Sequence, residues 1–90
     1  MVEHTFETGD YAEDKREPTP SPEANTVEIL ELTHEQADEH TVEETGKTVA
    51  EHKYNKHYPN DDPVVIGHYP YMNGNNNKTF AFPESRLRKL

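Results

Sequence analysis

The chain has 90 residues, a net charge of −9, 30% apolar residues, and no cysteine or tryptophan. This length allows one small domain, and without cysteine neither a disulfide nor a thiolate-bound metal can stabilise it. No run of about 18 apolar residues is present, which excludes a membrane-spanning helix. The N-terminus lacks the basic and apolar segments of a signal peptide, so the sequence predicts a soluble, cytoplasmic protein.

Charge is distributed unevenly along the chain. Residues 1–52 contain 15 Asp and Glu against 3 Lys and Arg, whereas residues 53–90 contain 3 against 6. This distribution is typical of a solvated acidic surface followed by a polar segment. A basic C-terminal half that contacts an acidic partner or a nucleic acid is the alternative interpretation.

Residues 1–25 are predicted to form a disordered, acidic and proline-rich tail. Three prolines and several charged residues lie between Glu13 and Asn25, and such a composition favours an extended, non-helical backbone. Phe6 and Tyr11 are the only large side chains before Val27, which are too few to form a buried face. We therefore expect the ordered domain to comprise residues 26–90.

The domain is expected to begin with a strand at residues 26–32, TVEILEL, because β-branched and aliphatic residues dominate there. The alternation is imperfect, since Val27 and Ile29 lie on one face and Leu30 and Leu32 on the other. A helix that starts after Asn25, with Glu28 completing a capping box, is the alternative.

Two short helices are predicted next. Thr33 and Gln36 have the spacing of a capping box, which predicts a helix from about residue 34 to residue 40. Thr48 and Glu51 repeat this spacing, with Gly46 as a break between the two helical turns. A hairpin that turns at Thr45-Gly46 is the less favoured alternative.

The last third of the chain is the most strand-like. The apolar run at residues 63–69 is bounded by Pro63 and Pro70, and Asn73-Gly74 is a strong hairpin signal. A returning strand at residues 78–82 would place Phe80 and Phe82 on one face, and residues 85–90 would form a final turn. The predicted class is α+β: a small mixed sheet of about three strands in the order β-α-β-β, with one or two short helices.

The triplet Gly46-Lys47-Thr48 matches the end of a nucleotide-binding P-loop. That motif also needs an earlier glycine, where this chain has Thr41, and a buried strand before it, which residues 33–40 do not resemble. We therefore interpret Gly46 as a structural break and Thr48 as a helix cap.

No catalytic, metal or cofactor site is predicted. His52 and His57 have the loose spacing of a zinc pair, but the fold would have to supply His40, His68 or Asp62 as further ligands, so the six histidines are interpreted as surface residues. The chain has no cysteine nucleophile, and neither Ser21 nor Ser85 lies in a glycine-flanked turn. The sequence therefore predicts a protein that is not an enzyme.

The segment 53–89 interleaves aromatic and basic residues, a pattern with which proteins bind single-stranded nucleic acids. The net charge of −9 opposes that function, and a small domain needs these aromatic residues in its core. We therefore predict an interaction module for an unknown protein partner or for self-association as a homodimer, with nucleic acid as the alternative ligand. The candidate contact surface comprises Tyr69, Tyr71, Lys78, Phe80, Phe82, Arg86 and Arg88.

The acidic composition, rich in Glu and Thr and free of Cys and Trp, resembles that of cytoplasmic proteins from salt-in halophilic archaea. Within residues 26–87, the succession GKTVAEH, YPNDDPVV and FAFPESRL is similar to small uncharacterised haloarchaeal proteins. The resemblance implies a cytoplasm at molar salt, where charge repulsion is screened. It implies no activity and no functional residues.

Overall fold

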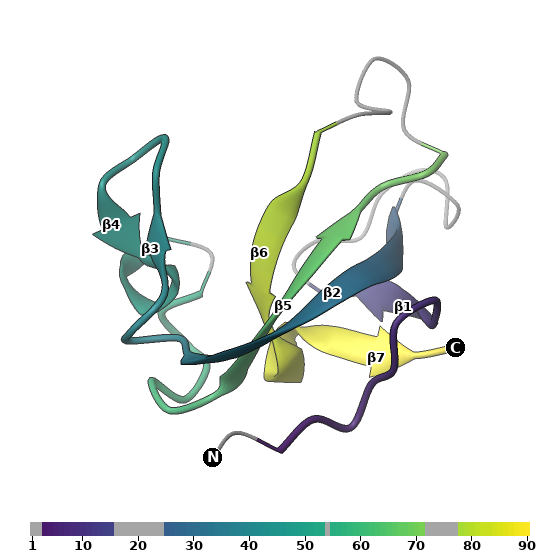
Figure 1. The fold of residues 1–90 in the computed structure, drawn as a ribbon, viewed down its shortest axis with the longest axis horizontal. Helices are drawn as coiled ribbons and strands as arrows, with labels where there is room; N and C mark the ends of the chain where they lie inside the picture. The colour runs from purple at the N-terminus through teal and green to yellow at the C-terminus, as the bar shows by residue number, and fades with distance from the viewer. Residues whose placement is uncertain (1–2, 16–24, 54, 72–77) are drawn as a thin grey trace.

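A computed structural model describes residues 3–15, 25–53, 55–71 and 78–90 of the chain. Its centre is a five-stranded antiparallel sheet in the order β6-β5-β2-β1-β7, with a separate two-stranded hairpin, β3-β4 (Figure 1). The central sheet comprises β1 (Tyr11–Asp14), β2 (Thr26–Gln36), β5 (Pro63–His68), β6 (Phe80–Pro83) and β7 (Leu87–Lys89). The hairpin comprises β3 (Thr41–Val42) and β4 (Lys47–Thr48), and two single-turn 3₁₀ helices are η2 (Val49–Glu51) and η3 (Glu84–Arg86).

The predicted α+β class is therefore wrong. The described residues form no α-helix, and each strand pair of the central sheet is antiparallel rather than mixed. The predicted strands at 26–32 and 63–69 are confirmed by β2 and β5, and the returning strand is confirmed by β6. The Asn73-Gly74 turn that was expected to join β5 and β6 lies outside the described residues.

The helix predicted at residues 34–40 is absent because β2 continues through this capping-box sequence to Gln36. The Thr33 hydroxyl donates across the sheet to the Val64 carbonyl at 2.8 Å instead of capping a helix. The less favoured hairpin is the one that forms: Gly46 has a φ of 70° in the turn between β3 and β4. This left-handed conformation is easily adopted by glycine, which has no Cβ.

Part of the predicted tail belongs to the fold. β1 lies inside the sheet between β2 and β7, and Ala12 is fully buried. Phe6 is 5% exposed and packs in the main core, although the sequence suggested that it was too isolated to do so. Residues 85–90 form η3 and β7 rather than a final turn alone, and β7 pairs with β1.

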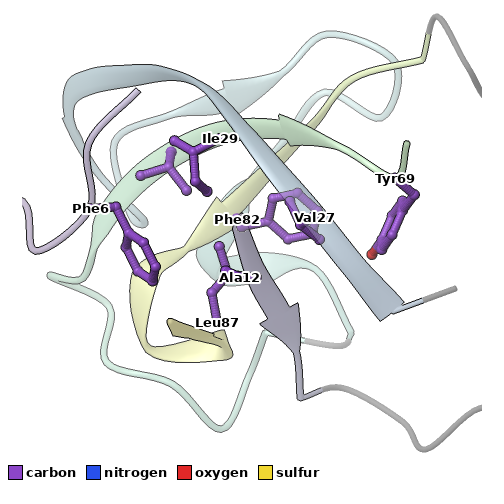
Figure 2. Packing of buried hydrophobic residues seen from close by; sticks show 8 residues of the cluster. Phe6, Ala12, Val27, Ile29, Tyr69, Phe82 and Leu87 are labelled. Carbon is purple, nitrogen blue, oxygen red and sulfur yellow. The ribbon is translucent and has the colours of Figure 1, made fainter. Parts of the chain in front are cut away.

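The core has two parts. The main cluster brings together side chains from the N-terminal segment and from all five strands of the central sheet, as Figure 2 shows: Phe6, Ala12, Val27, Ile29, Val65, Tyr69, Phe82 and Leu87. A second cluster of Ala37, Val49 and Val64 lies where the segment between β2 and β5 packs on the sheet. Val64 and Val65 thus belong to different clusters on the two faces of β5. Because both faces are buried there, the sequence of β5 is a continuous apolar run and does not alternate between apolar and polar residues.

Candidate interaction groove

A groove of about 440 Å³ lies between β6 and the segment from β3 to Asn55, and we call it the β6 groove. In Figure 1 the β3-β4 hairpin lies on the side of β6 that faces away from β5. One wall consists of residues 78–82, and the opposite wall is formed by Val42, Glu44, Thr45, Val49 and His52. Tyr69, Asn55 and Arg86 complete the lining. The volume falls within the range of ligand pockets.

Beneath the groove lies a buried polar network centred on Arg86. Its guanidinium forms two parallel hydrogen bonds with the Asp14 carboxylate, both 2.8 Å long, and a third bond of 3.0 Å with the Asn55 side-chain oxygen. The Tyr69 hydroxyl also donates to Asp14 at 2.6 Å. All four side chains are at most 5% exposed, so this network is buried apart from the small area with which three of them line the groove.

The charge of Arg86 is stabilised by its partner. Burial lowers the pKa of the guanidinium, but the hydrogen bonds and the negative charge of Asp14 outweigh burial, so the net shift is upward. The guanidinium also lies 5.0 Å from the centre of the Phe82 ring, a favourable cation–π distance. Asp14 neutralises the charge of Arg86, and Asn55 accepts a further hydrogen bond from its guanidinium. The network therefore supports the base of the groove and does not offer a free charge.

The aromatic side chains of the last third pack on one another beside this network. Tyr69 meets Phe80 and Phe82 edge-on, with ring centres 5.5 and 5.9 Å apart. Phe82 is buried, whereas Phe80 is partly exposed and contributes apolar surface to the groove. The prediction that Phe80 and Phe82 share a face is confirmed by their common contact with Tyr69.

A weak ion pair crosses the groove. Lys78 Nζ, before β6, lies 3.9 Å from Glu44 Oε2 of the opposite wall, and both side chains are about half exposed or more. Ion pairs of this kind contribute about 0–1 kcal/mol, so the pair can open readily when another charged group approaches. Lys78 also lies over the Phe80 ring, 5.4 Å from its centre.

The strand edge along the groove is unpaired. β6 is the last strand on its side of the sheet, and its inner edge pairs with β5 from Phe80 to Pro83. Within the described part of the chain, no backbone hydrogen bond is made at its outer edge. Because alternate N–H and C=O groups of an edge strand point away from its neighbour, β6 presents backbone groups towards the groove at its partly exposed end, Phe80 and Ala81, whereas Phe82 and Pro83 are buried and Pro83 has no N–H.

The structure brings together five of the seven predicted contact residues. Tyr69, Lys78, Phe80, Phe82 and Arg86 all line the β6 groove, although Tyr69, Phe82 and Arg86 are mostly buried. Tyr71 is 56% exposed and does not line the groove. Arg88 points from β7 on another part of the surface, where it contacts Glu13.

Several basic residues of the C-terminal half pair with carboxylates of the acidic half. Besides Arg86, Arg88 contacts Glu13, Lys89 lies 3.4 Å from Asp10, and Lys78 meets Glu44. The division of charge seen in the sequence is therefore partly neutralised by the fold. Sequence reasoning missed Asp14, Asn55 and Glu44, because their partners lie 31 to 72 residues away along the chain.

A second hollow, of about 430 Å³, lies beside η3 and the N-terminal segment. His4 contacts the Glu84 carboxylate through Nδ1 and donates from Nε2 to the Thr33 carbonyl at 2.6 Å. Thr5 donates to Glu84 through both its backbone N–H and its hydroxyl. Ser85 donates in the same two ways to Asp62, so these polar groups hold the N-terminal segment and η3 in place.

The remaining sequence motifs have structural positions. Gly46, Lys47 and Thr48 lie in the β3-β4 hairpin, and the Glu51 carboxylate accepts from the Thr48 N–H at 2.9 Å and from its hydroxyl at 3.0 Å. The predicted capping interaction is therefore present, ahead of a single 3₁₀ turn. Across the described residues no cluster of three or more potential metal ligands occurs, and no helix has the length and apolar character to cross a bilayer.

Comparison of the chain with protein-family models, curated proteins and solved structures gave no match. The resemblance to haloarchaeal proteins therefore stays a prediction.

Proposed function

We propose that this chain is a protein-interaction module and that the β6 groove is its contact surface. The observation that carries the proposal is the open groove beside a strand edge whose backbone groups have no partner in the described structure. Phe80 adds a partly exposed apolar wall, and exposed Thr45 and Thr79 frame the opening. A contact surface of this kind combines apolar area with directional hydrogen bonding.

The polar groups around the groove favour binding over catalysis. Arg86, Asp14, Tyr69 and Asn55 satisfy one another in a buried network, which supports the groove without offering a free nucleophile or base. Groups that are held this way give shape and rigidity to a site. We therefore assign the network a supporting role.

Nucleic-acid binding, the alternative ligand class, is less well supported. Lys78, Arg86, Arg88 and Lys89 each lie in an ion pair with a carboxylate. Tyr69 and Phe82, which would have to stack on bases, are at most 5% exposed. A polyanion would meet few unpaired cations on this part of the surface, and the net charge of −9 would repel it.

Selection from a displayed library of random peptides tests the proposal. Enriched peptides should bind the natural chain and lose at least about tenfold in affinity towards the double variant T45Y/T79Y, whose added rings fill the groove from both walls. The matched control is Thr8→Tyr, an exposed threonine outside the groove. Enrichment of no peptide, or equal binding to the natural chain and the groove-filled variant, would overturn the proposed function.

A further inference from the structure

We propose that the β6 groove takes a basic, extended peptide segment of a partner protein, which adds as a further strand to the outer edge of β6. This inference rests on the proposed function and specifies the chemistry of the partner. Two independent features of the groove define that chemistry: one wall offers backbone hydrogen-bonding groups, and the other carries the exposed carboxylate of Glu44.

The strand edge defines the conformation of the partner. β6 pairs with β5 along one side only, and in the described structure its outer side makes no backbone hydrogen bond. The donors and acceptors of a strand edge repeat every second residue, and an extended chain matches that repeat. Strand addition of this kind obtains affinity from the main chain and specificity from alternate side chains. Phe82 and Pro83 of β6 are buried, so about four residues of the partner would lie along Phe80, Ala81 and the exposed residues 78–79 before them.

The opposite wall defines the charge of the partner. From residue 31 to residue 51 the chain carries seven Asp and Glu and one Lys. Glu43 and Glu44 are exposed in the β3-β4 turn, and Glu44 lines the groove itself. Its present contact is the weak pair with Lys78, at 3.9 Å. A lysine or arginine of the incoming segment would replace Lys78 as the partner of Glu44, and a second basic residue of the segment would meet the neighbouring Glu43.

The apolar part of the groove defines which side chains of the partner segment must be apolar. Side chains of a strand alternate between its two faces, so those that point inward from the added segment would lie against Phe80 and Val42. The segment would therefore alternate basic and apolar residues. An acidic segment is disfavoured, because its carboxylates would face Glu43 and Glu44 at close range.

The test uses a twelve-residue peptide of alternating lysine and valine, and its counterpart with glutamate in place of lysine. The lysine peptide should bind the full chain, with affinity that falls at least about threefold between 0.05 and 0.5 M NaCl because exposed charge pairs are screened. The double variant E43Q/E44Q should weaken binding about three- to tenfold at low salt. Glu7→Gln, an exposed carboxylate outside the groove, is the matched control and should change affinity less than twofold.

Single N-methyl groups along the lysine peptide test strand addition directly. Methylation at every second position should reduce affinity about tenfold or more, and methylation at the positions between them should have little effect, since only alternate N–H groups face β6. Amide exchange should slow at the outward-facing N–H groups of residues 78–81 when the peptide binds.

Three outcomes would overturn this inference. They are a preference for the glutamate peptide, equal sensitivity to methylation at all positions, and a dimer of the chain alone whose β6 amides are already protected by a second copy. The proposed function would survive the first two if library peptides still lost affinity for T45Y/T79Y. Failure of that library experiment would remove both proposals.

Discussion

At the scale of single residues, Arg86 stabilises the base of the groove and is not a surface residue that contacts a partner. The sequence suggests a surface cation, because Arg86 precedes Arg88 and Lys89 in a basic C-terminal segment. In the fold its guanidinium is buried and shares two hydrogen bonds with Asp14, which was expected to lie in a disordered tail. A buried charge needs such a partner, because removal of one member leaves the other uncompensated in a poorly solvated site. The groove therefore depends on Arg86 for its shape.

Replacement of Arg86 by methionine should lower the free energy of unfolding by about 3–5 kcal/mol, since Asp14 would stay buried without its cation. Arg88→Met is the matched control: Arg88 forms an exposed pair with Glu13, so the loss should be under about 1 kcal/mol. Urea unfolding followed by circular dichroism measures both. Equal losses in the two variants would contradict a central role for the buried pair.

Gly67 lies where β5 packs tightly against β2. A Cβ atom at this position would lie 2.6 Å from Val27 Cγ1 and 2.8 Å from the Glu28 carbonyl oxygen. The second contact is with the backbone, so rotation of a side chain cannot relieve it. Gly67→Ala should therefore lower the free energy of unfolding by about 1–3 kcal/mol, the usual effect of an overpacked site. An unchanged midpoint of thermal unfolding would contradict this prediction, because it would mean that β5 and β2 can move apart enough to accommodate the methyl group.

At the scale of elements, β2, β5 and β6 were predictable from the sequence, whereas β1, β7 and the β3-β4 hairpin were not, and the predicted helices do not form. The β-branched runs in β2 and β5 have the composition of strands wherever they are buried, so local sequence was sufficient. Capping boxes are weaker evidence, because a threonine hydroxyl can bond to any nearby acceptor. Thr33 bonds to Val64 across the sheet, a contact over 31 residues that no local pattern reveals. Thr48 and Glu51 do form their capping contacts, but the helix ends after one 3₁₀ turn.

The Thr48–Glu51 contact should make the hairpin region sensitive to acid. The hydrogen bond from the Thr48 backbone lowers the pKa of Glu51 below its ordinary value of 4.5. A carboxyl group with a lowered pKa in the folded state stabilises the fold above its ordinary pKa, and this contribution disappears as the pH falls through the folded-state value. Glu51→Gln should therefore reduce the loss of stability between pH 5 and pH 3, measured by urea unfolding. Glu43→Gln, on the same hairpin, serves as the control, and an identical pH profile for both variants would contradict the role of the cap.

At the scale of the whole molecule, long-range pairs join the acidic and basic halves. Asp10, Glu13 and Asp14 contact Lys89, Arg88 and Arg86, respectively, so residues 10–14 are bound to residues 86–89 by charge as well as by the backbone pairing of β1 with β7. The sequence revealed the division of charge but not these pairs, because pairing depends on which strands are neighbours. The same reason explains why the groove was predicted only in part: its β6 wall was predicted, and the wall opposite was not.

Removal of residues 1–15 should abolish folding, whereas removal of a disordered tail would leave the fold intact. β1 is the strand between β2 and β7, so its loss would leave β7 without a partner strand and Arg86 without Asp14. Phe6 and Ala12 would also be lost from the main core. The amide NMR spectrum of the truncated chain should show the narrow dispersion of an unfolded protein. A dispersed spectrum that resembles that of the full chain would contradict this expectation.

The pairing of β1 with β7 has a consequence for synthesis of the chain. Ribosomes add about 5–20 residues per second, so β7 follows β1 by roughly 4–15 s. During that interval the nascent chain can form the β1-β2 hairpin, but one edge of β1 has no partner and Asp14 has no cation. An open edge of this kind can pair with other chains. The nascent chain therefore keeps an edge that is prone to aggregation until β7 appears, and the carboxylates of β1, which repel those of another nascent chain, oppose such pairing during this interval.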